Sequence, residues 1–249
     1  MNSIDYKEFY DKVGKTNGWN FSSVKCISEG IKWDFYSEVT KACKKSDLLL
    51  DIGTGGGEAI LSIAEAALLL VGIDQSTGMI ETATNNLANS GRANVRFLKM
   101  DAEKLNFPES FFNIVSCRHS VFYAKEIANV LVKEGIFLTQ QVSENDKLNI
   151  KEAFGRGQSL GISGGTLKHQ YIAELSEAGF TEIQSFDCNV IEFYQTAEDL
   201  IFLLNHTPII PNFGQTEFDF QILQQFIMEN QTEKGIKTNS ERFMIIARL

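Results

Sequence analysis

Short apolar runs alternate with amphipathic stretches through most of the chain. The first run, Leu48 to Leu50, is too short for a helix and is followed at once by glycines, so it predicts a buried strand that ends in a tight turn. Beyond the turn, apolar residues recur at helical spacing, which predicts a strand, a glycine loop and a helix in succession. The alternation continues, and further strands are predicted at 68–73, 95–101, 111–117, 136–142 and 243–249.

Strands that alternate with helices are typical of a doubly wound α/β fold, in which a mostly parallel sheet has helices on both faces. Segment 180–194 also has a β pattern, as one strand or two. Thr196 and Asp199 have the form of a capping box, which predicts the start of a helix after this segment. Ahead of the sheet, a helical stripe predicts a helix that packs on it, through Val24, Ile27, Ile31 and Phe35.

These patterns predict a single domain over residues 1–249. Within it we expect an N-terminal helical or lid segment at 1–45, a ligand-binding core at 46–142 and a helical insertion at 195–238 that covers the substrate side. In the first segment, Tyr10 and Trp19 either close over a ligand or simply pack, and the sequence favours neither.

Charge and cysteine content narrow the class of ligand. The formal net charge is −9 and the pI about 5.0, so the chain has no general attraction to nucleic-acid phosphates or anionic lipid, and a small molecule is the expected substrate. The cysteines are scattered singly, so we expect no metal site and reduced thiols in a cytoplasmic protein. Neither a membrane-spanning run nor the apolar block of a signal peptide is present, so no membrane partner is expected.

Polar residues follow successive predicted strands where each strand ends. The glycine loop from Gly53 to Gly57 follows the first strand, Asp74 ends the second, Asp101 ends the third, and residues 117–119 follow the fourth. The carboxyl ends of parallel strands share one edge of the sheet, which is where open α/β sheets bind ligands. The sequence therefore predicts a ligand across this edge.

Each carboxylate suits a different part of a nucleoside ligand. Asp74 can accept hydrogen bonds from both hydroxyls of a ribose, and Asp101 from an adenine amino group, while a backbone N–H near Ala102 meets a ring nitrogen. Asp51 would repel the pyrophosphate of a dinucleotide and attract an ammonium group. Glu58 occupies the third glycine place of the dinucleotide pattern, which weakens an NAD interpretation.

Three motifs at this edge carry a family resemblance. The segments Asp51-Ile-Gly53-Thr-Gly55-Gly-Gly57, Asp74-Gln-Ser-Thr-Gly-Met79 and Asp101-Ala102 resemble the successive cofactor motifs of class I S-adenosylmethionine-dependent methyltransferases, within the small-molecule group called type 11. The resemblance covers residues 46–142. The flanking segments carry no motif that indicates a substrate.

The resemblance implies a Rossmann-like sheet of seven strands whose last strand is antiparallel, with 243–249 inserted into it. It implies S-adenosylmethionine as the cofactor and S-adenosylhomocysteine as the product. The amine end of the cofactor would meet Asp51 and the glycines, with Cys117 and Arg118 nearby. The implied cofactor-binding residues are Asp51, Gly53, Thr54, Gly55, Gly57, Asp74, Gln75, Met79, Asp101, Ala102, Cys117 and Arg118.

Methyl transfer needs a general base only if the nucleophile arrives protonated, because the methyl donor is already activated. No motif singles out such a base, and the candidates are His119, Tyr123, Glu144 and His206. Other functions stay open: an rRNA or tRNA methyltransferase, a non-catalytic S-adenosylmethionine-binding protein and an NAD oxidoreductase. Against a nucleic-acid substrate, residues 116–119 read Ser-Cys-Arg-His where amino-methylating nucleic-acid enzymes carry an N-P-P-Y type motif.

Overall fold

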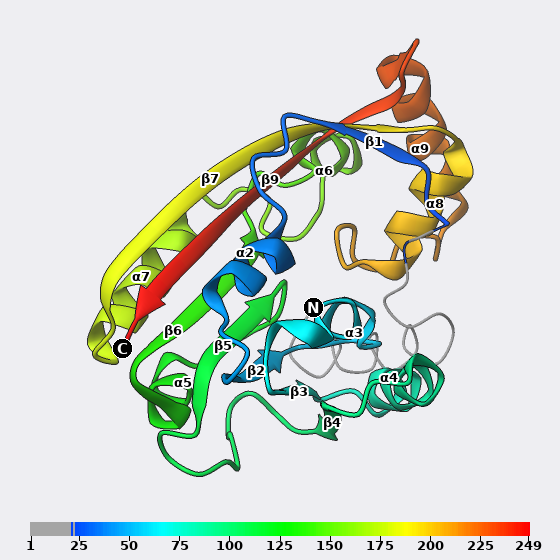
Figure 1. Cartoon of the computed structure of the whole chain (residues 1–249). Helices are drawn as coiled ribbons and strands as arrows, with labels where there is room; N and C mark the ends of the chain where they lie inside the picture. Colours follow the sequence, from blue (N-terminus) through cyan, green and yellow to red (C-terminus); the bar gives the residue numbers. More distant parts are fainter. Residues whose placement is uncertain (1–20, 22) are drawn as a thin grey trace.

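The central sheet is parallel and open. A computed structural model describes Phe21 and residues 23–249, in which the strand order is β1-β7-β9-β6-β5-β2-β3-β4, with β8 paired to β9 (Figure 1). Five neighbouring strands run parallel: β6 (Leu131–Val142), β5 (Phe112–Arg118), β2 (Leu48–Ile52), β3 (Leu69–Asp74) and β4 (Val95–Lys99). Their carboxyl ends therefore share one edge, as the sequence predicts.

The remaining strands are antiparallel. Strand β9 (Gly235–Arg248) lies between β6 and β7 (Thr181–Tyr194), β1 (Cys26–Glu29) pairs with β7, and the short β8 (Gln231–Thr232) pairs with β9. The prediction of a doubly wound, mostly parallel sheet with an antiparallel last strand is confirmed. The predicted number of seven strands is wrong for the described residues, because β1 and β8 extend the sheet to nine.

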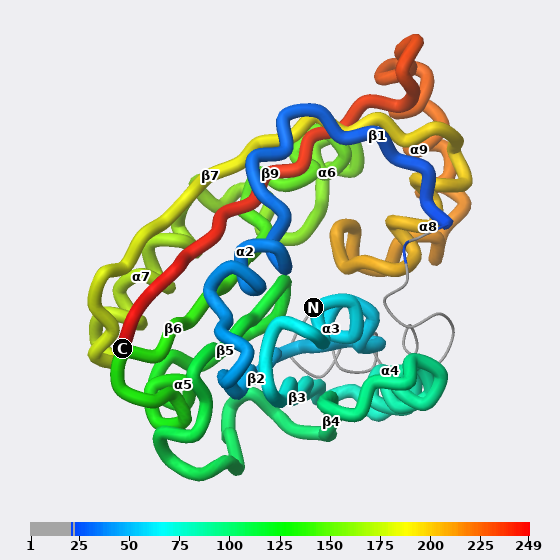
Figure 2. Tube along the Cα trace, viewed as in Figure 1, coloured from blue at the N-terminus to red at the C-terminus, as the bar shows by residue number. Residues whose placement is uncertain are grey.

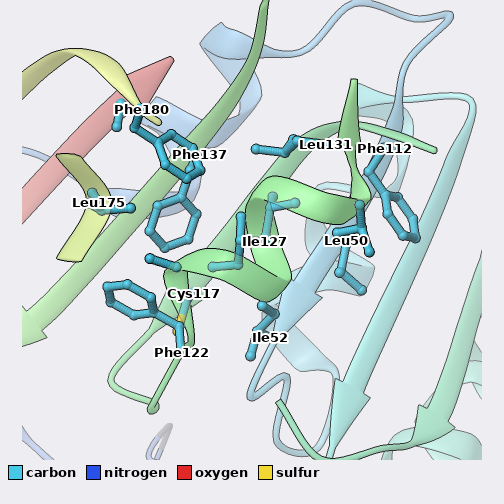
Figure 3. Packing of buried hydrophobic residues seen from close by; sticks show 14 of the residues in the cluster. Leu50, Ile52, Phe112, Cys117, Phe122, Ile127, Leu131, Phe137, Leu175 and Phe180 are labelled. Atoms are coloured by element: carbon cyan, nitrogen blue, oxygen red, sulfur yellow. The ribbon is translucent and has the colours of Figure 1, made fainter. Parts of the chain in front are cut away.

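Helices cover both faces of the parallel strands. On one face, α5 (Ala124–Val130) and α7 (Thr166–Glu177) pack Ile127 and Leu175 against a core that includes Phe112 and Phe137 (Figure 3). On the other face, α2 (Phe35–Ala42), α3 (Glu58–Ser62), the 3₁₀ helix η1 (Ala64–Ala66) and α4 (Thr77–Ser90) contribute to a second core. The sheet is thus buried on both sides, which explains why its strands read as continuous apolar runs.

A third core lies at the far ends of the two long strands. Beyond the part of β9 that pairs with β6, β7 and β9 continue together and meet α6 (Leu148–Phe154), α8 (Ala197–His206) and α9 (Glu217–Asn230). Figure 1 shows these helices gathered at the opposite end of β9 from the C-terminus. The capping box at Thr196 and Asp199 begins α8, as predicted.

The helix predicted from the stripe at 24–35 is wrong over most of its length. Residues 26–29 form β1, which runs along the outer side of β7 (Figure 2), and the helix begins only at Phe35. The reason is that alternate residues of β1 face the third core, so Ile27 and Ile31 are 48% and 62% exposed. Segment 181–194 is one strand. The predicted lid residues Tyr10 and Trp19 lie outside the described residues.

Within the described part of the chain, no helix combines the length and apolarity that a membrane crossing requires.

Candidate functional site

The glycine loop after β2 folds tightly against β3. The backbone N–H groups of Gly53 and Thr54 both donate to the carbonyl of Ile73, and the N–H of Gly55 donates to Asp74 Oδ2 at 3.0 Å. Gly57, at φ +78°, is the residue before α3, and a Cβ there would strike the ring of Phe97. The loop therefore needs glycine for its backbone conformation and for its close packing.

Asp51 lies at the carboxyl end of β2 and is only 1% exposed. Its Oδ1 accepts a hydrogen bond from the Ser116 hydroxyl at 2.6 Å, whereas its Oδ2 is buried and has no partner among the described residues. Burial raises the pKa of Asp51 to about 7, against opposing effects of Ser116, Thr54 and the Arg118 charge. A buried carboxylate with an unused oxygen is suited to a ligand that brings a positively charged donor.

The hydroxyl of Thr54, in the loop itself, is also buried without a partner among the described residues. Thr54 and Tyr36 are near enough to Asp51 to lower the pKa of its carboxyl. Neither Asp51 Oδ2 nor the Thr54 hydroxyl has a well-formed hydrogen bond among the described residues, and buried polar atoms almost always have a partner, so both are available to a ligand. Asp51 Oδ2 can accept from an ammonium, and Thr54 can donate or accept. The residues present therefore fit the amino-acid end of S-adenosylmethionine.

Asp74 is half-buried at the end of β3, where the nucleoside was predicted. Its Oδ1 accepts from the N–H of Ser76 at 2.8 Å, and its Oδ2 accepts from Gly55. These bonds orient the carboxylate. The cap of α4 is Ser76, which accepts from the N–H of Met79, so Asp74 is not the helix cap. Gln75 lies between the two residues.

Asp101 and Ala102 follow β4 at the same edge. The N–H of Met100 donates to the carbonyl of Asp74 at 3.0 Å, which joins the ends of β3 and β4. Asp101 is exposed, and its Oδ1 accepts from the N–H of Glu103, while Ala102 packs against the first core. The structure thus brings the loop and the three acids to one edge in the predicted order, Asp51, Asp74 and Asp101.

Residues 117–120 line the site beyond β5. Cys117 is buried, burial raises the pKa of its thiol, and its Sγ donates to the carbonyl of Ser120, so it is a neutral wall residue. A Cβ at Gly53 would strike the Ser120 side chain, which shows how closely the two loops approach. The Arg118 guanidinium lies 5.7 Å from the ring centroid of Tyr36.

The four candidate bases lie in different surroundings. His119 is beside the site, and its Nε2 lies 3.0 Å from the amide nitrogen of Gln140. Tyr123 is 40% exposed. Its partial burial raises the pKa of its hydroxyl, and the nearby charges of Glu103 and Asp101 raise it further. Glu144 accepts from the N–H groups of Gly165 and Leu167 at 2.9 and 2.6 Å, a structural role at the start of α7.

The last candidate, His206, belongs to α8. Its ring stacks on Phe202 at 3.9 Å between centroids, and its Nδ1 lies 2.8 Å from the Phe202 carbonyl. Of the four candidates, only His119 directly follows a strand of this edge, β5, and contacts a residue of the neighbouring strand, Gln140 of β6. The assignment of a base stays a prediction.

The sequence analysis missed several polar residues around Asp51. Burial raises the pKa of Tyr36 on α2, and the nearby charge of Asp51 raises it further. Ser116 sits opposite Asp51 in the register of β2 and β5, and Trp33 donates from its indole to Gln140 at 2.7 Å. The sequence could have indicated Ser116, because it is a polar residue in an apolar strand. It could not have indicated Trp33 and Tyr36, because they belong to another segment of the chain.

The strand order and the site together define a class I methyltransferase fold. Residues 49–135 match the family model described as a methyltransferase domain. This match, over about a third of the chain, supports methyltransferase activity and the resemblance to class I methyltransferases.

Relatives of known sequence match a part of the chain. The uncharacterized methyltransferase YcgJ of Bacillus subtilis is 33% identical over 106 residues, which are 40% of this chain and 42% of YcgJ. The aklanonic acid methyltransferase DauC of Streptomyces sp. strain C5 is 33% identical over 88 residues, which are 34% of this chain and 40% of DauC. The alignments thus span about two fifths of these relatives.

Solved structures show the likeness of fold over more of the chain. The crystal structure of YcgJ from Bacillus subtilis has a TM-score of 0.63 at 22% identity and covers 86% of this chain and 97% of YcgJ. The [4+2]-cyclase SpnF has a TM-score of 0.63 at 18% identity, covering 100% of this chain and 97% of SpnF. At such identities, the fold alone is shared.

Proposed function

We propose that the protein is an S-adenosylmethionine-dependent methyltransferase that acts on a small molecule. The observation that carries the proposal is Asp51, a buried carboxylate with one unpaired oxygen beside the glycine loop. A ligand with an ammonium group, a ribose and an adenine offers a partner to Asp51, Asp74 and Asp101 in that order along the edge.

The residues of the chain act by binding and orientation. A bound sulfonium supplies an activated methyl group, so alignment of the acceptor accounts for most of the rate. Asp51 holds the amino-acid end, and Asp74, already oriented by Gly55 and Ser76, holds the ribose. Ser116 and Cys117 are buried on β5, which pairs directly with β2, and they exclude water beside Asp51.

A small acceptor is supported by charge and by one relative. The net charge of −9 opposes binding to a nucleic-acid backbone, which keeps an rRNA or tRNA substrate as the less supported alternative. The relative DauC is named as a methyltransferase of aklanonic acid, a small molecule. A non-catalytic S-adenosylmethionine-binding protein is the other alternative, since fold and cofactor site persist when chemistry is lost.

Isothermal titration calorimetry with S-adenosylmethionine and S-adenosylhomocysteine tests the proposal. We expect micromolar binding of both. Asp74→Ala should weaken binding by about tenfold to a hundredfold, because charge-assisted hydrogen bonds to the ribose are lost. Glu81→Ala is the matched control: it removes an exposed carboxylate on α4 and should leave the affinity unchanged.

No heat with either ligand on folded protein would refute the proposed function. If both ligands bind, mass spectrometry of reactions with small-molecule and RNA pools separates the alternatives. Methylated small molecules with release of S-adenosylhomocysteine support the proposal, methylated RNA supports the nucleic-acid alternative, and intact cofactor supports the non-catalytic one.

A further inference from the structure

Hydrogen-bond donors lie at the same edge of the sheet, on the opposite side of Asp51 from the nucleoside residues. In the order β9-β6-β5-β2-β3-β4, Asp74 and Asp101 are at the ends of β3 and β4. Arg118 ends β5, His119 follows it, and Arg242 is on β9, opposite Val142 of β6. A ligand that extends from Asp51 toward β4 leaves this second side for another molecule.

The proton on His119 is placed by its neighbours. The indole of Trp33 can only donate, and it donates from Nε1 to Gln140 Oε1 at 2.7 Å, so the amide nitrogen of Gln140 faces His119. That nitrogen is itself a donor, and it lies 3.0 Å from His119 Nε2, which therefore accepts. The single ring proton of the neutral imidazole is then on Nδ1, so His119 presents a donor to the site.

His119 stays neutral because its surroundings disfavour a second proton. Burial, and then the positive charges of Arg118 and Arg242, hold the pKa of His119 well below its usual range. Both guanidinium groups are thus close enough to His119 to act on its charge. His119 is thus unsuited to act as a base through Nε2, whose lone pair is occupied.

Both arginines keep an unused donor. The Nε atoms of Arg118 and Arg242 are buried and have no hydrogen-bond partner among the described residues. Arg242 shares Glu192 with Lys147, at 3.2 and 2.5 Å, so one carboxylate serves two cations. Arg118 has no ion-pair partner in the described part of the chain. The carboxyl of Asp51, whose pKa the Arg118 charge lowers, is assigned to the ammonium.

Resting on the proposed function, we propose that Arg118, His119 and Arg242 bind an anionic oxygen of the methyl acceptor, such as a carboxylate or an ionised phenol or enol. The open polar atoms in this set are donors, so the complementary group is an acceptor, and donors on guanidinium groups bind an anionic oxygen more strongly than a neutral one. The carboxylate of the cofactor has the same chemistry. The position of Arg242, three strands from β2 toward β7, favours the acceptor.

Nuclear magnetic resonance on protein saturated with S-adenosylhomocysteine tests this assignment. The Nε–H signals of both arginines are assigned with Arg118→Gln and Arg242→Gln, and the ¹⁵N shifts of His119 report its tautomer. Acetate and benzoate are titrated against their neutral counterparts acetamide and benzamide. We expect the carboxylates to shift the Nε–H signals of both arginines and to bind about tenfold more tightly than the amides. In Arg118→Gln, the affinity for the carboxylates should fall by a similar factor.

Arg96→Gln is the matched control, because Arg96 donates only to the carbonyls of Ala93 and Val95 and its loss removes the same charge elsewhere. Equal effects of carboxylates and amides, silent arginine signals, or a proton on His119 Nε2 would overturn the proposal. The proposal would also be overturned if S-adenosylhomocysteine alone shifted the signals of both arginines and prevented the carboxylates from binding. That result would assign the donors to the cofactor. Failure of S-adenosylhomocysteine to bind at all would instead refute the proposed function.

Discussion

Binding of a cationic cofactor should release a proton from Asp51. Burial raises the pKa of this carboxyl to about 7 in the ligand-free protein, and an ammonium at Oδ2 stabilises the charged form and lowers that pKa. Affinity should therefore fall as the pH drops below about 7, because the ligand must then displace the proton.

The size of the effect follows from the fraction of Asp51 that is ionised. With a pKa of about 7, that fraction falls from about three quarters at about pH 7.5 to about three per cent at about pH 5.5. If only the ionised carboxylate binds the ammonium, the dissociation constant rises about 25-fold over this range, or about 1.9 kcal/mol.

Calorimetry with S-adenosylhomocysteine in buffers of different ionisation enthalpy measures both the affinity and the protons released. Asp51→Asn should bind weakly with a flat pH profile. Asp74→Asn should also bind weakly but should keep the slope, because Asp51 is untouched. An affinity that is constant over the range, with no proton released, would show that Asp51 does not meet the ammonium.

Three further predictions concern stability and the loop. The pKa of Asp51 is higher in the folded than in the unfolded protein, so ionisation of Asp51 lowers the stability as the pH rises from about 4 to about 7. Asp51→Asn should therefore stabilise the ligand-free protein at pH 8 by up to about 4 kcal/mol, measured by urea unfolding. Equal stability of the two proteins at that pH would contradict this. Gly57→Ala should abolish cofactor binding, measured by calorimetry, because the residue is held at φ +78° against Phe97; normal affinity would mean that the loop can adjust. Lys147→Met should cost about 3–5 kcal/mol in urea unfolding, since it leaves the buried Glu192 with Arg242 as its only cation, beside the hydroxyl of Tyr194; a loss below about 1 kcal/mol would show that these two partners suffice.

The parallel half of the fold could be predicted because its signals are local. The glycine loop, Asp74 and Asp101 each come directly after an apolar strand, and parallel strands bring their ends together whatever lies between them. The capping box at Thr196 is also a local signal, and α8 begins there.

The remainder depends on contacts between distant segments. The stripe at 24–35 fits a helix, but pairing with β7 makes residues 26–29 a strand, an example of tertiary context overriding a periodic pattern. Trp33, Tyr36 and Gln140 reach the site only because α2 and β6 pack beside β5. No spacing in the sequence records these neighbours.

The long pair of β7 and β9 connects the parallel strands, which bear the proposed cofactor site, to a separate helical core. Residues 242–248 of β9 pair with β6, whereas residues 236–241 pair with β7, and Ile236 also pairs with β8 and packs in the core of α6, α8 and α9. That core shares no residue with the two that support the parallel strands. Replacement of 195–238 by the corresponding helices of a homologue should therefore leave the proposed cofactor site intact, and it tests the prediction that this segment covers the substrate side.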